Sequence, residues 1–180
     1  MAKLIYSVTM SLDGYIAGPG GDMSWLTPHL GPNPVVDELI QQIGSLLVGH
    51  RTYVDDDPHR GTEKEGKAFG GGWEGPQFVL TRHPPETSPP GITFVDNLQD
   101  AVAAAKAAAG GTYVNVLGAD VGRQCLKHGL LDEILTLVAP VLLGDGPPLF
   151  RVTGGTDVAL ERRDVASPSH VSNLWYRVLR

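Results

Sequence analysis

The chain has 180 residues, of which 42% are hydrophobic and 19% are charged. This length suits a single domain with a sizeable core and is short for two domains of ordinary size. With 14 Lys and Arg against 20 Asp and Glu, and no basic run longer than two residues, the sequence argues against nucleic acid as a principal partner.

The first half of the chain alternates strand and helix signals. In chain order, the sequence predicts a strand at 3–10, a long Gly- and Pro-rich loop at 18–34, a helix at 34–44, a strand at 45–49 and a helix beginning at 50–53. The helix at 34–44 rests on apolar residues at helical spacing from Val36 to Ile43, with Pro34 in its first turn. A connection as long as 18–34 is often functional.

The second half continues the alternation and ends differently. The sequence predicts strands at 77–81 and 92–95, a helix at 98–109, a strand at 113–117, a helix from 118 to near 129, a buried strand at 134–143, and two antiparallel strands at 158–165 and 173–179. Pro140 lies inside the buried strand and demands a bulge or a sheet edge there. Helices between strands, followed by two strands without a helix, predict a three-layer α/β domain with a mixed sheet over residues 1–180.

The compartment follows from the cysteine count and the apolar runs. Cys125 is the single cysteine, which excludes an intrachain disulfide and a cysteine-based zinc site. The N-terminal residues lack the apolar segment of a signal peptide, and no apolar run approaches the ~18 residues of a membrane helix. We therefore expect a soluble, cytoplasmic protein with no membrane partner.

Several motifs match by letters but not by context. Residues 61–68 mimic a phosphate-binding loop, yet Ala68 stands where the magnesium-binding hydroxyl belongs and no apolar strand precedes it. The glycines between 70 and 75 have dinucleotide-fingerprint spacing but precede a strand instead of a helix. The six histidines are scattered, so we expect no metal site, and Cys125 is expected to be a buried structural thiol. The acidic run at 55–58 is expected to be a solvated loop.

Three strand ends supply groups suited to an anionic nucleotide. At 49–52, a glycine allows close backbone approach, and a following helix start adds N–H groups, an arginine and a threonine hydroxyl. At 81–82, a hydroxyl and a cation suit the 2′-phosphate of NADP. At 117–122, small residues lead into a helix and suit a pyrophosphate. Ordinary turns and solvated arginines are the structural alternatives, and for Asp120 a helix N-cap is the preferred interpretation.

The combination of blocks resembles the reductase domain of the riboflavin-biosynthesis deaminase/reductase, within the dihydrofolate-reductase-like superfamily. The resemblance covers nearly the whole chain and rests on 11–17 (SLDGYIA), 47–53 (LVGHRTY), 79–82 (VLTR), 118–120 (GAD), 129–134 (GLLDEI), 140–146 (PVLLGDG) and 149–150 (LF). It implies a dihydrofolate-reductase-like α/β fold, NADPH as hydride donor, a small heterocyclic substrate and a homodimer.

The resemblance is carried over residue by residue. Gly49 and Thr52 match the family's phosphate motif, with His50 at its arginine position and Arg51 one place later. Asp120 stands where the family's glycine-rich turn has a further glycine. By resemblance, the residues after the first turn line the nicotinamide slot, and Trp25 closes a loop over it or serves as a core anchor. The candidate cofactor-binding residues are Ile16, Ala17, Trp25, Gly49, His50, Arg51, Thr52, Thr81, Arg82, Gly118, Ala119, Asp120, Val121 and Gly122.

Three residues are candidates for the acid or substrate-orienting group: Asp13, Asp37 and Tyr53. Asp13 precedes a glycine, so a turn role is the alternative. Asp37 lies beside the apolar stripe of the first helix, where a solvated first-turn carboxylate is the alternative. The expected function is an NADPH-dependent reductase of a small pterin-, pyrimidine- or related heterocyclic substrate. A deazaflavin-dependent reductase and a non-catalytic nucleotide-binding module on the same fold are the other hypotheses.

Overall fold

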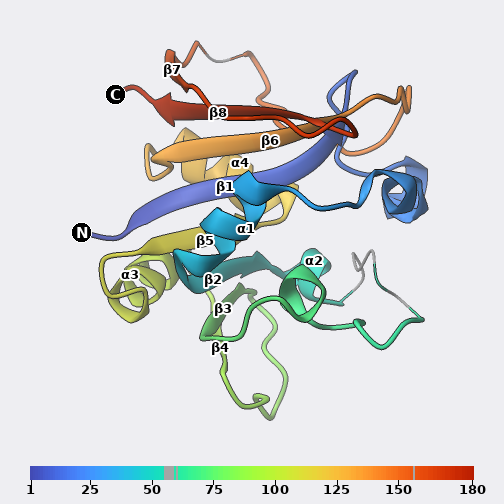
Figure 1. Cartoon of the computed structure of the whole chain (residues 1–180). Coiled ribbons are helices and arrows are strands. Elements are labelled where there is room, and N and C mark those ends of the chain that lie inside the picture. Colours follow the sequence, from blue (N-terminus) through green and yellow to red (C-terminus); the bar gives the residue numbers. More distant parts are fainter. Residues whose placement is uncertain (55–58, 60, 156) are drawn as a thin grey trace.

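A computed structural model describes residues 1–54, 59, 61–155 and 157–180. Eight strands form one sheet in the order β4-β3-β2-β5-β1-β6-β8-β7 (Figure 1). All neighbouring pairs from β4 to β6 are parallel, and β8 is antiparallel to both β6 and β7. The predicted mixed sheet and the antiparallel final pair are therefore confirmed. The acidic run at 55–58 lies outside the described residues.

The elements follow the predicted order. They are β1 (Lys3–Ser11), the 3-10 helices η1 (Pro19–Gly21) and η2 (Ser24–His29), α1 (Pro34–Gln41), β2 (Ile43–Gly49), α2 (His50–Val54), η3 (Ala68–Gly71), β3 (Gln77–Leu80), β4 (Ile92–Val95), α3 (Leu98–Ala108), β5 (Tyr113–Leu117), α4 (Ala119–Lys127), β6 (Glu133–Ala139), β7 (Leu160–Arg163) and β8 (Ser172–Val178).

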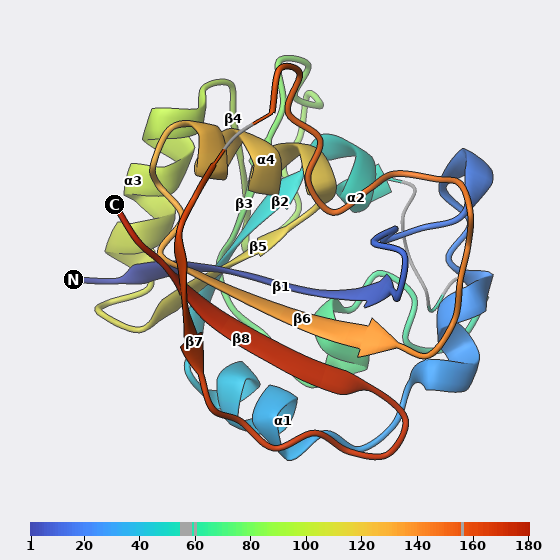
Figure 2. The same ribbon diagram turned by 90° about the horizontal axis from the view of Figure 1, so that it is seen from above.

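The sheet separates two hydrophobic layers. Figure 2 shows α3 and α4 on one face and α1 on the other. Because side chains alternate along a strand, successive residues of β1 enter different layers. Leu4 and Tyr6 pack in the core beneath α3 and α4, and Ile5 packs with Leu39 of α1; all four are fully buried. The chain is thus a three-layer α/β structure, as predicted.

The prediction that the first helix closes at Gly44 is wrong. The α1 helix ends at Gln41, and Ile43 already pairs with Tyr113 of β5 as the first residue of β2. Gly44 lies at a β-bulge, where a Cβ atom would overlap the Thr112 hydroxyl and the Ala109 carbonyl. Tertiary packing against the end of α3 therefore overrides the helical spacing of the apolar residues.

The predicted strand at 134–143 is also too long. Strand β6 ends at Ala139, immediately before Pro140, because proline has no N–H to donate to the sheet. The prediction of a buried Cys125 is confirmed, and burial raises the pKa of its thiol to about 12. Within the part of the chain that the structure describes, no helix is long and apolar enough to cross a membrane.

Candidate functional site

A cleft of about 1940 Å³ opens at the carboxyl ends of the parallel strands. Its floor contains the ends of β2, β3 and β5, together with Val8 and Thr9 of β1 and Leu137 of β6. Ligands of open α/β sheets bind at this edge, because strand ends and helix N-termini converge there. The cleft is therefore the candidate site.

The three predicted strand-end segments meet in this cleft. Gly49 to Thr52, Thr81 and Arg82, and Leu117 to Val121 all line it. Gly118 has φ +107°, and a Cβ atom there would lie 2.7 Å from the Thr52 hydroxyl oxygen. Gly49 is in turn close to Val121, because a Cβ atom added to Gly49 would lie 3.2 Å from Val121 Cγ2. The three predicted strand-end segments therefore lie together at one edge of the sheet, as binding of a single nucleotide requires.

The N-terminus of α4 differs from the preferred interpretation of Asp120. The N-cap is Gly118, which has no side chain to cap the first N–H groups, so Asp120 is not the cap. Asp120 lies in the first turn, where its carboxylate pairs with Arg123 and accepts a hydrogen bond of 2.8 Å from Gln124. The backbone donors at this helix end therefore face the cleft without a side-chain cap.

Gly122 lies outside the residues that line the cleft. It is buried against β1, and a Cβ atom at this position would come within 2.8 Å of the Tyr6 ring. The glycine allows α4 to pack closely on the sheet, which is the role of the third glycine in dinucleotide-binding turns. Tyr6 also packs edge-to-face on Phe150 with 5.7 Å between ring centroids. Burial raises the pKa of the Tyr6 hydroxyl.

The opposite wall of the cleft belongs to the α1 face of the sheet. Val36, Asp37 and Ile40 of α1 line it, and Met23 and Leu26 from the long loop add apolar surface. The suspicion that the loop at 18–34 contributes to a site is consistent with this placement. Of the three candidates for the acid group, Asp37 and Tyr53 line the cleft.

Asp13 lies outside the cleft lining and holds two turns together. Its carboxylate accepts hydrogen bonds from the Ser11 hydroxyl and from the backbone N–H groups of Leu143 and Gly144, at 2.5, 3.1 and 2.8 Å. The Ser11 hydroxyl does most to hold the pKa of Asp13 below its ordinary value, and the two amides add to it against the opposing effect of desolvation. This placement favours the turn role over the catalytic role.

Ile16 and Ala17 line the cleft, whereas Trp25 does not. The Ile16 N–H donates to the Pro147 carbonyl at 2.9 Å, so the loops after β1 and β6 run side by side. At Gly146, where φ is +134°, a Cβ atom would overlap the Ala17 carbonyl oxygen. The Trp25 ring instead contacts His29, 6.2 Å away between centroids.

Several residues of the cleft are not among the predicted site residues. Lys64 and Lys67 come from segment 61–68, which resembles a phosphate-binding loop only by its letters; Phe69 follows that segment, and Arg151 follows the last family block. Phe69 adopts φ +51°, a left-handed conformation uncommon for a bulky residue and often found at functional sites. The length of the polar stretch before β3 was the one available hint.

The cleft is positively charged in an acidic chain. Among the described residues, its lining contains six Lys and Arg against three Asp: Arg51, Lys64, Lys67, Arg82, Arg123 and Arg151 against Asp37, Asp96 and Asp120. Arg51 and Arg82 are exposed and have no ion pair among the residues that the structure describes. Focused positive charge beside uncapped helix donors and the Thr52 hydroxyl fits a dinucleotide phosphate.

Comparison with known proteins places this geometry in a family. A protein from Shewanella sp. PV-4 named for riboflavin biosynthesis is 26% identical, with a TM-score of 0.74 and complete coverage of both chains. The diaminohydroxyphosphoribosylaminopyrimidine deaminase/5-amino-6-(5-phosphoribosylamino)uracil reductase of Thermotoga maritima is 19% identical over 99% of this chain and 57% of its own, with a TM-score of 0.70.

Dihydrofolate reductase from Enterococcus faecalis is 15% identical, with a TM-score of 0.58 over 98% of this chain and 96% of its own. The likeness confirms the predicted dihydrofolate-reductase-like fold. The sequence profile of the RibD C-terminal domain matches residues 2–168. This confirms the resemblance found in the sequence and relates the chain to riboflavin-biosynthesis reductases. The chain belongs to the RibD C-terminal domain family.

Proposed function

We propose that the chain is an NADPH-dependent reductase that transfers hydride to a small heterocyclic substrate of the pyrimidine or pterin type. The observation that supports this most is that one cationic cleft joins the three strand ends. The names of similar proteins support it as well, because they include a uracil reductase and a dihydrofolate reductase complexed with NADP(H).

The cofactor half of the cleft lies on the side of α2 and α4. The uncapped N-terminus of α4, with the Thr52 hydroxyl beside Gly118, would hold the pyrophosphate. Arg82, which follows β3, would pair with the 2′-phosphate. Ile16 and Ala17 would contact the nicotinamide. When bound, NADPH supplies the hydride, and the protein's part is to position the acceptor atom and exclude water.

The substrate half lies beneath α1. Val36, Ile40 and Phe69 offer apolar surface to a planar ring, and Asp37 is the carboxylate of α1 in the cleft lining. A carboxylate there would accept a hydrogen bond from a ring N–H and so orient the acceptor atom toward the cofactor. Tyr53, whose ring packs edge-to-face on Phe94 at 5.5 Å, is the second candidate for orienting the substrate.

Calorimetric titration of the purified protein with NADPH and with NADH tests the cofactor assignment. We expect saturable binding of NADPH. Arg82→Gln should weaken it about tenfold and leave NADH binding nearly unchanged, since a hydrogen bond to a charged group contributes about 1.5–3 kcal/mol. Arg162→Gln is the matched control, because Arg162 lies on β7 and pairs with Asp164 away from the cleft. Absence of saturable binding to either nucleotide contradicts the proposal.

Turnover tests the reaction. With NADPH bound, a panel of pyrimidines and pterins should contain a compound that oxidises NADPH, and Asp37→Asn should slow that reaction at least about tenfold. Binding without reduction of any panel member would favour the non-catalytic module. Displacement of NADPH by a deazaflavin that supports faster turnover would favour the deazaflavin alternative. The homodimer implied by the family stays a prediction, which light scattering measures.

A further inference from the structure

A buried amide pair connects α1 to strand β8. Asn33 and Asn173 are 5% and 6% exposed and lie 140 positions apart in the sequence. Asn33 Nδ2 donates to Asn173 Oδ1 at 2.9 Å, and Asn173 Nδ2 donates back to Asn33 Oδ1 at 3.1 Å. Asn173 Nδ2 also donates to the Ala166 carbonyl at 2.6 Å, and the Asn173 N–H donates to the Ser167 hydroxyl at 2.8 Å.

Asn33 also begins the helix that forms the substrate wall. It is the N-cap of α1, and its side-chain oxygen accepts from the Val35 N–H at 3.3 Å. Its backbone carbonyl accepts from the Asp37 N–H at 3.0 Å. The helix is short and buries one residue fully, Leu39, so its cap is a large part of what fixes it. Asn33 therefore joins Asp37 to Asn173 through three hydrogen bonds, one with Asp37 and two with Asn173.

The loop between β7 and β8, residues 164–171, supports the same wall at a second point. The His170 ring packs over Gly31, where a Cβ atom would lie 3.1 Å from the imidazole. Gly31 and Leu30 line the cleft and lead directly into Asn33. The loop thus lies behind both the entrance to α1 and its N-cap.

We infer that Asn173 is a positioning residue for the substrate half of the cleft: through its amide pair with Asn33, strand β8 and the β7–β8 loop bonded to Asn173 hold α1 and with it Asp37. The inference rests on the proposed function for its consequence on substrate binding. Burying an amide group without a hydrogen-bond partner costs free energy, so the pair has one favourable arrangement. Because Asn33 caps α1, this arrangement also fixes the position of the helix. The pair lies away from α2 and α4, so its loss should not change the cofactor half of the cleft.

Hydrogen exchange in α1 tests the positioning directly. In Asn173→Ala and in Asn33→Ser, which retains a capping oxygen, the amides of residues 37–41 should exchange about tenfold faster than in the wild type. The double variant should exceed neither single variant by much, because both act through one pair. Ser45→Ala is the control, since it removes another buried hydrogen bond, 2.8 Å to the Ala105 carbonyl beside α3. This control should leave α1 exchange unchanged.

Kinetics supply the second readout. For the panel compound that the wild type reduces, the two asparagine variants should raise KM about tenfold and leave the Kd of NADPH unchanged. Exchange in α1 that is no faster than in Ser45→Ala overturns the inference, and so does faster exchange with an unchanged KM. If the wild type binds NADPH but reduces nothing, the proposed function fails and the exchange data alone decide on the Asn33–Asn173 link. Asn33→Ser keeps the test available should Asn173→Ala fail to fold.

Discussion

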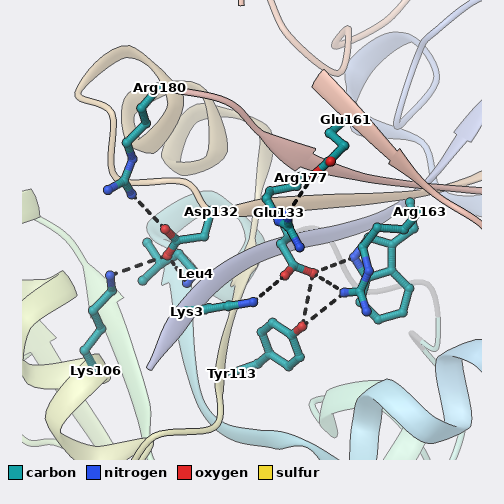
Figure 3. A network of polar contacts seen from close by, with 11 residues as sticks. Lys3, Leu4, Lys106, Tyr113, Asp132, Glu133, Glu161, Arg163, Arg177 and Arg180 are labelled. Carbon is teal, nitrogen blue, oxygen red and sulfur yellow. Dashed lines mark hydrogen bonds and ion pairs between the residues drawn. The ribbon is translucent and has the colours of Figure 1, made fainter. Parts of the chain in front are cut away.

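Charged side chains at the two ends of the parallel strands differ in how they are paired. At the amino ends, Glu133 is buried at the start of β6 and accepts from Lys3 at 2.9 Å, Arg163 at 2.7 Å, Trp175 at 2.8 Å and Tyr113 at 3.0 Å (Figure 3). The Arg163 guanidinium also lies 4.4 Å from the centroid of the Trp175 ring. This cluster joins β1, β5, β6, β7 and β8.

Asp132, a second acidic residue at the same edge, is also paired within the chain. The Asp132 carboxylate accepts from the Leu4 N–H at 2.9 Å and pairs with Lys106 at 3.5 Å and with Arg180 at 2.7 Å (Figure 3). These contacts tie the end of α3 and the C-terminal residue to the sheet. Charges at the amino ends are therefore paired within the chain.

At the carboxyl ends the pattern is reversed. Arg51, Lys64, Lys67, Arg82 and Arg151 line the cleft without an ion pair among the described residues. Unpaired cations gathered in one concave surface repel each other and add no ion pair that would stabilise the fold. One edge of the sheet therefore stabilises the fold through paired charges, whereas the other leaves these five cations unpaired, which suits the anionic cofactor that we propose.

Removing the carboxylate at the amino edge should give the largest change in stability. Breaking a buried ion pair by deleting one partner costs about 3–5 kcal/mol. Lys3 and Arg163 are 52% and 40% exposed and can be rehydrated, so for Glu133→Ala we expect the lower end, about 3 kcal/mol. Urea unfolding measures the loss, and the Kd of NADPH should not change at temperatures where the variant is folded. A weakened Kd would contradict the separation of the two edges.

A steric clash at the carboxyl edge should weaken cofactor binding, which the change at the amino edge should not. Gly146→Ala forces a Cβ atom against the Ala17 carbonyl, and overpacking of this kind costs about 1–3 kcal/mol. The loop that presents Ile16 and Ala17 must move, so NADPH binding should weaken by about tenfold or more. Gly144→Ala is the matched control: it lies in the same turn at φ +75° with no atom within 4 Å of a Cβ. Equal losses in both variants would assign the effect to backbone strain.

Acid should weaken the amino edge by a smaller amount. Burial raises the pKa of Glu133, but the hydrogen bonds from Lys3 and Trp175 and the charge of Arg163 lower it by more, to below the ordinary 4.5. A depressed folded-state pKa adds stability above pH 4.5 that is lost as pH falls through the folded value. The difference in unfolding free energy between wild type and Glu133→Gln should therefore be constant from about pH 7 to about pH 5 and shrink below 4.5. A difference that stays constant down to about pH 3 would refute the assignment.

The elements and the family could be predicted because their signals are local or come as motifs. The strand at 3–10 and the alanine-rich helix at 98–109 follow from composition and match β1 and α3 closely. The three strand ends could be placed together because parallel strands bring their carboxyl ends to one edge. The predicted end of the helix at 34–44 was wrong because of a long-range contact: Ile43 pairs with Tyr113, 70 positions away.

The rest of the cleft depends on contacts without sequence signals. Lys64 and Lys67 reach the site because their polar segment folds back over the α1 face, where Ala68 and Phe69 pack on the core beside β2. The packing role of Gly122 depends on the ring of Tyr6, which comes from a distant strand. The sequence could not distinguish the turn role of Asp13 from a catalytic role, because two of its three hydrogen-bond donors come from the distant residues Leu143 and Gly144.

Strand β7 has a consequence for how the molecule behaves in a crowded solution. It closes one border of the sheet, and its four residues, of which three are charged, are all exposed. A second chain that tried to extend the sheet at this border would have to bring its own Glu161 and Arg162 out of water. The border therefore resists the strand-by-strand growth that leads to aggregates.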